Sequence, residues 1–276
     1  MDTPKLKLGR KRVRKQGEVM ITHNSRLRRH TTHLVYILSL FVVFLRLLSV
    51  DSATAGSLSE PLLEIKVSDP RPLSAAILIL EARTKLAITY EDPPYLYPDE
   101  IAVSPEGPLI PKGGSIDFSY SDDSEPSNII QSLLEAHSKM GNPGIFQVDK
   151  SEGFYLVFPL KYRNEKGELI PQSSLLDSPI SISAQNISGI DIIEILCDKL
   201  SKALNKNVMI GMIPTKPFSK IYESYNVIDQ PARSHLIKLI KDSGNSLSWQ
   251  MLYDPKLKWY VLNIHYIGYI RSATKK

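Results

Sequence analysis

The stretch RPLSAAILILEARTKLAITY, residues 71–90, decides the fold that we predict for this 276-residue chain. Pro72 favours the first turn of a helix, because its missing N–H needs no partner at that position. The apolar residues that follow recur at helical spacing and would form one buried face: Leu73, Ala76, Ile77 and Leu80. Leu86–Tyr90 then has the composition of a β-strand. This stretch therefore predicts a helix that leads directly into a strand.

The residues around this stretch complete a first predicted α+β module, residues 60–163. A second helix is expected to begin near Pro126 and to end at Gly141. The remaining segments alternate or are apolar enough to be strands, the last two as a hairpin: Leu62–Val67, Ser115–Tyr120, Ile145–Val148 and Phe154–Phe158.

Residues 180–270 follow the same order. Ser188 and Asp191 resemble a capping box at the start of a helix, and Pro231 and Gly244 bracket another. The predicted strands are Ile180–Ala184, Asn207–Met212, Ile221–Val227, Leu247–Tyr253 and Trp259–Tyr266. A polar stretch, residues 164–179, would be the linker. We predict an α+β fold of two tandem small modules, each β-α-β-β-α-β-β with its helices on one face of its own sheet, after an N-terminal apolar helix.

Residues 1–55 have the pattern of an export signal. The apolar run Leu34–Val50 follows a basic leader and precedes Ala53 and Ala55, a small-x-small pattern typical of signal-peptide cleavage. A run of this length is also compatible with a retained anchor in the inner membrane. The rest of the chain is expected outside the cytoplasm, either periplasmic or anchored. Met20 is an alternative start, because the leader before the run is long.

The positive charge of the chain belongs to this leader. Residues 1–55 hold 11 Lys/Arg and 3 Asp/Glu, a net charge of +8, so the formal +5 of the whole chain leaves −3 for the remainder. Nucleic-acid binding is not expected, because it needs basic residues clustered on the folded part. Cys197 is the only cysteine, which excludes an intrachain disulfide, and its apolar neighbours indicate a buried thiol.

Motifs for catalysis, metal binding or cofactor binding are not found after the leader. His137, His235 and His265 are far apart in the sequence, and none belongs to a zinc-binding pattern. Neither a Gly-x-Ser-x-Gly elbow nor a phosphate-binding glycine loop is present. We therefore predict no catalytic residue, no metal and no cofactor.

Two regions are candidates for partner binding. Residues 91–114 contain six prolines, together with Tyr95, Tyr97 and Asp99. Proline-rich backbone loses little entropy on binding, and the two tyrosines, which we expect to be exposed, would give amphipathic contact area. A stiff connection between strands would have the same composition. Trp259 lies among aromatic residues of the final hairpin, where it would either contact a partner or pack across the strands.

Several segments together resemble the secretin/TonB short N-terminal domain. In the first half they are RPLSAA (71–76), LAITY (86–90), IIQSLL (129–134) and FYLVF (154–158). In the second half they are ARSHL (232–236) with the apolar residues up to Ile240, LSW (247–249) and YVLNI (260–264). The resemblance implies a periplasmic protein-binding module without catalytic residues. The loop after Tyr90 is longer than such modules usually need.

The expected function is therefore non-enzymatic: protein binding or scaffolding in the bacterial cell envelope, with an envelope protein as partner. Binding would occur by strand addition at an open sheet edge, helped by the proline-tyrosine loop. One alternative is an envelope hydrolase that uses scattered acids and a histidine: Asp99, Glu100, Asp122 and His137. The other is a protein that binds a small ligand between the modules.

Overall fold

The computed structural model describes residues 62–268. The predicted leader, the apolar run Leu34–Val50 and the alternative start Met20 lie outside these residues. Residues 62–268 all lie within a single compact unit. No helix within residues 62–268 has the length and apolar character needed to cross a membrane.

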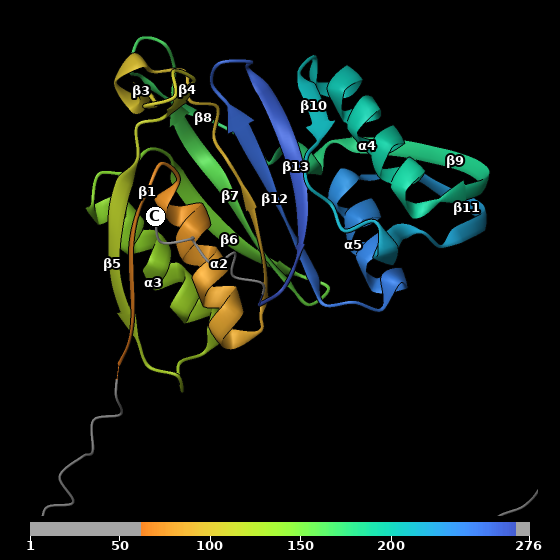
Figure 1. The fold of residues 1–276 in the computed structure, drawn as a ribbon, viewed down its shortest axis with the longest axis horizontal. Coiled ribbons are helices and arrows are strands. Elements are labelled where there is room, and N and C mark those ends of the chain that lie inside the picture. The colour runs from red at the N-terminus through yellow and green to blue at the C-terminus, as the bar shows by residue number, and fades with distance from the viewer. Residues whose placement is uncertain (1–61, 269–276) are drawn as a thin grey trace, which may run out of the picture. The chain divides into compact units, whose positions relative to one another are not determined.

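The first half contains two α-helices and all the strands predicted for it (Figure 1). Its elements in chain order are β1 (Leu63–Asp69), α2 (Pro72–Thr84), β2 (Ala87–Glu91), the 3-10 helix η1 (Pro98–Glu100), β3 (Ile101–Val103), β4 (Leu109–Pro111), β5 (Gly114–Tyr120), α3 (Pro126–Lys139), β6 (Ile145–Ser151), β7 (Phe154–Arg163) and β8 (Leu169–Pro171). The short strands β3, β4 and β8 were not predicted.

The second half repeats the order without those short strands. Its elements are η2 (Leu175–Asp177), β9 (Pro179–Ser188), α4 (Gly189–Leu204), β10 (Asn207–Ile210), η3 (Lys216–Phe218), β11 (Ile221–Pro231), α5 (Ala232–Ser243), β12 (Leu247–Asp254) and β13 (Trp259–Tyr266). The predicted capping box is present: Ser188 Oγ accepts from the N–H of Asp191, and the Asp191 carboxylate accepts from the N–H of Ser188.

Strand pairing also recurs. In the first half β1 and β5 form an antiparallel ribbon, while β2 pairs parallel with β7, and β7 pairs antiparallel with β6. In the second half β9 and β11 form the antiparallel ribbon, while β10 pairs parallel with β13, and β13 pairs antiparallel with β12. The two halves thus share one pairing pattern as well as one order of elements.

The prediction of a separate sheet for each half is wrong. Strand β12 pairs parallel with β2, so that six strands run in the order β10-β13-β12-β2-β7-β6, and β8 completes a seven-stranded sheet beside β7. Hydrophobic alternation shows which face of a strand is buried, but the edges of a strand are backbone groups that carry no side-chain signal. The sequence pattern therefore did not reveal that two edges meet.

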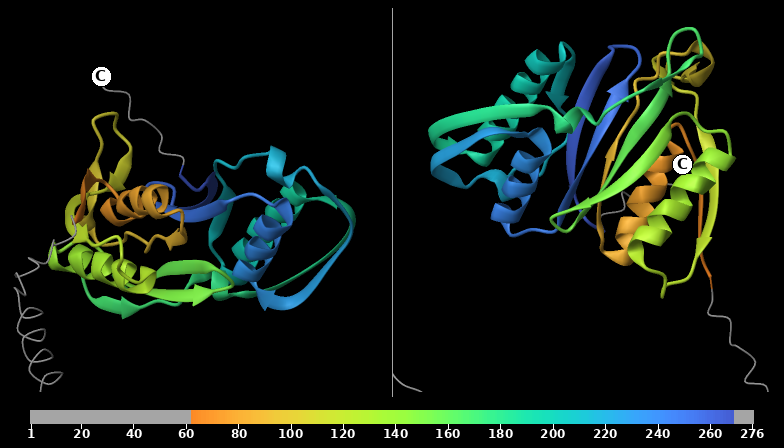
Figure 2. Two further views of the ribbon diagram at one scale, coloured as in Figure 1. Left: turned by 90° about the horizontal axis from the view of Figure 1, so that it is seen from below. Right: turned by 180° about the vertical axis from the view of Figure 1, so that it is seen from behind.

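Each face of this sheet is covered by the helices and ribbon of one half (Figure 2). Strand β7 shows the division, because its side chains alternate between two cores. Phe154, Leu156 and Phe158 belong to the core with α4, α5 and the β9–β11 ribbon. Tyr155 and Val157 belong to the core with α2, α3 and the β1–β5 ribbon. The two helix pairs thus lie on opposite faces of one shared sheet.

The predicted linker, residues 164–179, is part of the fold. It contains β8 and η2, and Leu175 and Leu176 of η2 are 4% and 0% exposed in the core beside α4 and α5. The polar residues that suggested a linker surround this buried pair of leucines.

Candidate functional site

The most concentrated polar cluster lies where the two halves meet. We call this region the seam: residues Ala87–Tyr95 on one side and β12 on the other. The Asp92 side chain is fully buried and accepts four hydrogen bonds. Its Oδ1 accepts from the hydroxyls of Tyr90 (2.7 Å) and Tyr95 (3.1 Å), and its Oδ2 accepts from Arg71 Nε (2.7 Å) and the N–H of Tyr253 (2.9 Å). Four donors fill the acceptor capacity of a carboxylate.

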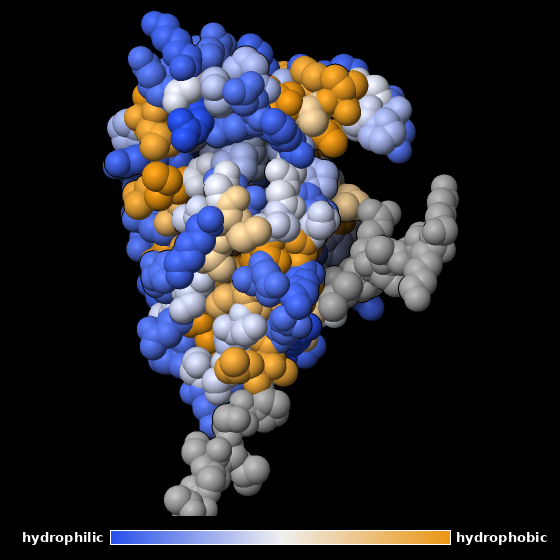
Figure 3. Space-filling model, turned by 90° about the vertical axis from the view of Figure 1, so that its left-hand side faces the viewer, coloured by the Kyte–Doolittle hydropathy of each residue, from blue (hydrophilic) through white to orange (hydrophobic). Residues whose placement is uncertain are grey.

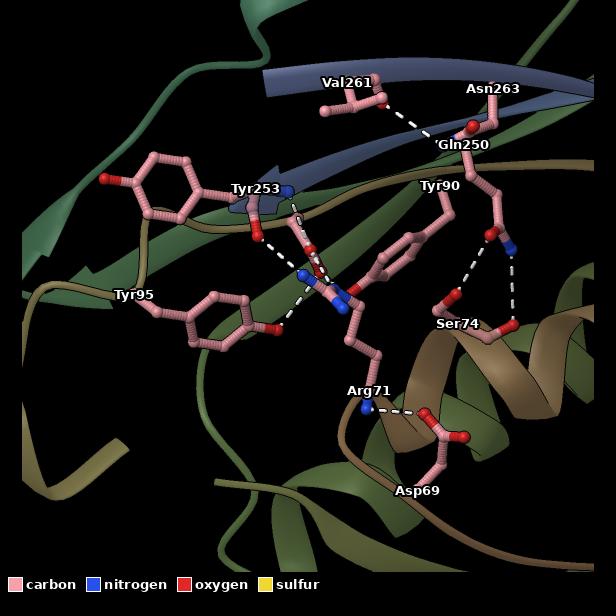
Figure 4. Close-up of polar contacts among 10 residues, drawn as sticks. Asp69, Arg71, Ser74, Tyr90, Tyr95, Gln250, Tyr253, Val261 and Asn263 are labelled. Carbon is pink, nitrogen blue, oxygen red and sulfur yellow. Dashed lines mark hydrogen bonds and ion pairs between the residues drawn. The ribbon is translucent and has the colours of Figure 1, made fainter. Parts of the chain in front are cut away.

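Arg71 links three parts of the chain in this cluster (Figure 4). In addition to the bond from Nε to Asp92, Arg71 Nη2 donates to the carbonyl oxygen of Tyr253 at 2.6 Å. The backbone N–H of Arg71 donates to Asp69 Oδ1 at 2.7 Å. Burial tends to lower the pKa of Arg71, but the neighbouring Asp92 carboxylate and the tyrosines outweigh it, so the pKa is raised. Burial, and then the Asp92 charge, raise the pKa of Tyr90 and of Tyr95 well above the ordinary value. These hydroxyls keep their protons at neutral pH.

Side chains of α2 extend the seam along the same face of β12. Ser74 Oγ donates to Gln250 Oε1 at 3.0 Å, and Ser248 Oγ donates to the carbonyl oxygen of Ile88 at 2.9 Å. Glu81 accepts from the N–H of Ile88 at 2.9 Å and lies 2.8 Å from His265 Nε2. The polar residues of the seam are thus bonded to one another across the two halves.

Another buried carboxylate belongs to Glu91, the last residue of β2. Glu91 accepts from Ser174 Oγ at 2.5 Å and from the N–H of Leu175 at 2.9 Å, just before and within η2. Arg233 on α5 pairs with Asp177 nearby. Burial raises the pKa of Glu91 to about 7, although the hydrogen bond from Ser174 and the charge of Arg233 act in the opposite direction. Glu91 therefore holds η2, and with it the connection between the halves, against β2.

The predicted partner-binding residues differ in their exposure to solvent. Tyr95 is 4% exposed and bonded to Asp92, so the expectation that it is exposed is wrong. Tyr97 is half-buried and donates to the exposed Asp99 at 2.8 Å. Trp259 is half-buried at the start of β13, where it lies between Asn207 of β10 and Asp254 of β12. Tyr97 and Asp99 adjoin β3, whereas Trp259 belongs to the central sheet.

The residues of the alternative hydrolase site are dispersed. His137 is buried in the core of the first half, edge-on against Phe146, and burial lowers its pKa to about 4. Glu100 pairs with Arg163, and Asp99 and Asp122 are exposed. Across residues 62–268, no three His, Cys, Asp or Glu side chains are placed to hold a metal ion.

A hollow of about 380 Å³ lies on the second half and not at the seam. It contains none of the residues predicted for a site, and its lining is mixed in charge: Lys216, Pro217, Ser219, Lys220, Asp242, Ser243, Asn245 and Tyr266. The ligand site predicted between the halves would lie at the seam, where the side chains pack directly and bond to one another.

A projecting hairpin is the feature that our sequence reasoning missed. Strands β3 and β4 form this hairpin, which we call the arm. Val103 and Leu109 lie opposite each other near its tip and are 69% and 38% exposed. Hydrophobic surface gathers on the arm, which extends to the upper right in Figure 3. The signal in the sequence was a pair of short apolar segments on either side of Ser104–Pro108, inside a stretch that we had interpreted as a loop.

The base of the arm is held by the neighbouring β7–β8 hairpin. Glu100 pairs with Arg163 of β7, their atoms Oε1 and Nε being 3.5 Å apart. A side chain at Gly167, in the β7–β8 turn, would begin 3.0 Å from the ring of Tyr97. Two leucines of this hairpin, Leu160 and Leu169, are 37% and 48% exposed. The arm is therefore anchored at its base and apolar at its tip.

Comparisons with family models, with curated proteins and with solved structures found no match to this chain.

Proposed function

We propose that this protein is a non-enzymatic protein-binding component of the bacterial cell envelope, and that the arm binds its partner. The single observation that carries the proposal is the exposure of Val103 and Leu109 at the tip of an anchored hairpin. A partner that covered this pair of apolar side chains would remove them from water, which favours association.

The chemistry of the seam supports a role other than catalysis. A general acid or base needs an accessible proton and a pKa near the working pH. Asp92 is enclosed by four donors, and the tyrosines that bind it have strongly raised pKa values. This cluster is suited to holding the two halves together.

The arm is suited to strand addition. Strands β3 and β4 pair only with each other among the described elements, so each has an outer edge of backbone groups. An extended segment of an envelope protein would pair with such an edge and place an apolar side chain against Val103 or Leu109. The turn between the strands carries Glu106, which would favour a partner with a nearby basic residue.

The envelope location rests on the leader and on the resemblance to secretin/TonB short N-terminal domains. The recurring strand pairing supports an origin from two copies of one such module, with the seam as a later junction between them. Both features are compatible with a docking protein that acts outside the cytoplasm.

The proposal can be tested by site-specific photo-crosslinking in intact bacteria that produce the full chain. A photoreactive phenylalanine analogue at Val103 should give a discrete adduct with another protein, whereas the same analogue at Ser119, exposed on β5, should not. The double substitution Val103→Asp with Leu109→Asp should prevent binding of that partner without lowering the urea midpoint. The same adducts from both positions, or none from Val103, would show that the arm is not a docking site.

A further inference from the structure

The two strands at the outer edges of the seven-stranded sheet occupy positions equivalent to those of the two strands that meet in the seam. The shared pairing pattern gives β10 the place that β2 has in the first half, because each pairs parallel with the last strand of its half. It likewise gives β12 the place of β6, because each is the first strand of the closing hairpin. The seam therefore joins a β2-type edge to a β6-type edge, and the strands left at the ends of the sheet are β10 and β6.

We propose that copies of this chain associate head to tail, with β10 of one copy paired parallel to β6 of the next. The pairing would repeat between molecules the β2–β12 junction within each molecule. The inference goes beyond the proposed function, because it concerns the ends of the central sheet and not the arm. Such a contact is heterologous, so it would build rings or open chains and not a symmetric dimer.

The register of the contact follows from the seam. Ala87 of β2 lies opposite Phe154, the first residue of β7, and Asn207 of β10 lies opposite Trp259, the first residue of β13. Ala87 therefore corresponds to Asn207. Three residues further along each strand, Tyr90 corresponds to Ile210. On the other strand of each closing hairpin, Ser151 lies opposite Phe154 and Asp254 lies opposite Trp259, so Ser151 corresponds to Asp254. The same number of residues earlier in each strand, Gln147 corresponds to Gln250.

The seam pairs Gln250 with Tyr90 and Met251 with Glu91. Transferring these pairs to the outer strands places Gln147 of one copy opposite Ile210 of the next, and Val148 opposite Gly211.

The side chains at the β10 edge give an independent reason to expect a cover. Residues 207–213, NVMIGMI, contain no charged residue, and Met209 and Met212 are 40% and 65% exposed. Uncharged apolar edges are rare in monomeric proteins, because they template pairing with another chain. On the opposite edge, Ile145 at the start of β6 is 39% exposed.

The contact between copies would be weaker than the seam. In the seam, Asp92 binds the N–H of Tyr253, but the corresponding residue after β10 is Met212, which has no carboxylate. The hydroxyl of Ser201 also bonds both the N–H and the carbonyl oxygen of Val208, which leaves a shorter stretch of β10 for a neighbour. We therefore expect association that is reversible and increases with protein concentration.

Disulfide trapping with two single-cysteine variants tests the proposal. Full-length chains carrying Gln147→Cys or Ile210→Cys, each in a Cys197→Ala background, are oxidised separately and as an equimolar mixture. The mixture should give a disulfide-linked dimer that contains one chain of each variant, and neither variant alone should give one. A mixture in which Ser119→Cys replaces Gln147→Cys is the matched control and should give no link.

Two results of the trapping experiment would overturn the inference. One is that the mixture gives no mixed link, either at concentrations at which the protein associates or at the highest soluble concentration. The other is that one variant alone forms links. Sedimentation of a Val148→Pro variant provides a second measurement, because proline at the β6 edge removes a backbone donor. Val148→Pro should abolish concentration-dependent association, provided that its circular dichroism matches the parent. An association unchanged in this variant would also overturn the inference. Photo-crosslinking at Val103 is unaffected by either result, so failure here leaves the docking role of the arm standing.

Discussion

The backbone N–H of Tyr253 donates to Oδ2 of Asp92 at 2.9 Å, although 161 residues separate them in the chain. Asp92 follows β2 and Tyr253 belongs to β12, so this bond lies where the sheet of the first half becomes the sheet of the second. Arg71 completes the arrangement by binding the same carboxylate oxygen and the carbonyl oxygen of Tyr253. One carboxylate thus fixes the relative position of three segments.

Substitution of this carboxylate should be severe. Asp92→Asn replaces one acceptor oxygen with an NH₂ group that faces donors, and it leaves the charge of Arg71 without its buried partner. Breaking a buried ion pair in this way costs about 3–5 kcal/mol of unfolding free energy. Urea denaturation followed by circular dichroism measures this loss. Asp99→Asn, an exposed carboxylate in the same loop, is the control and should change the free energy by less than about 0.5 kcal/mol. Equal effects of the two substitutions would contradict the role assigned to Asp92.

Glu91 should make the protein less stable as the pH rises. Its pKa is raised from 4.5 to about 7 in the folded state, so the folded chain binds this proton more tightly than the unfolded chain. The neutral carboxyl is fully compatible with burial below about pH 4.5, and stability is lost as the pH increases toward 7. At 1.36 kcal/mol for each pH unit, the loss amounts to about 3 kcal/mol.

The measurement is the difference in unfolding free energy between Glu91→Gln and the parent from pH 4.5 to pH 8. This difference should shift in favour of the variant by about 3 kcal/mol across the range. His137 has the opposite sign, because its lowered pKa destabilises the folded state as the pH falls, but its contribution cancels in the difference. Glu165→Gln makes the same change of a carboxyl to an amide at an exposed position and is the matched control. A constant difference for Glu91→Gln would show that this carboxyl is not perturbed.

Gly189 should not tolerate alanine. It is buried at the first position of α4, where an added Cβ would lie 2.9 Å from the carbonyl oxygen of Phe218 and 3.2 Å from its Cα. These are backbone atoms of a packed segment, so the clash cannot be relieved by a side-chain rotation. Gly189→Ala should lower the unfolding free energy by about 1–3 kcal/mol, although alanine is the better helix former. The measurement is the melting temperature in thermal unfolding, and Glu194→Ala, at an exposed position of the same helix, is the control. A melting temperature of Gly189→Ala above that of the parent would contradict the clash.

Local structure was predictable because its signals are local. Pro72 begins α2, Ser188 and Asp191 cap α4, and the spacing of apolar residues placed α3 and α5 within a few residues of their ends. The two closing hairpins, β6–β7 and β12–β13, were likewise visible as paired alternating segments. The arm was missed because strands of three residues do not establish an alternation.

The candidate site was less predictable, because its residues acquire their roles only from partners distant in sequence. Tyr95 looked like an exposed contact residue of a proline-rich loop, yet its hydroxyl is buried against Asp92. Asp92 itself has no motif, and neither does Glu91, whose partners Ser174 and Leu175 follow more than 80 residues later. A carboxylate surrounded by prolines and tyrosines gives no indication of whether it is solvated or enclosed.

The sequence by itself determined the order of the α-helices and of the longer strands, the buried face of each helix and the likeness between the two halves, because these depend on residues a few positions apart. Only the tertiary structure decided that the halves share one sheet, because the edges of β2 and β12 are joined by backbone groups that every residue possesses. It also decided which polar residues are enclosed. Asp92 is saturated by four donors drawn from separate segments, and no property of a single segment specifies that meeting.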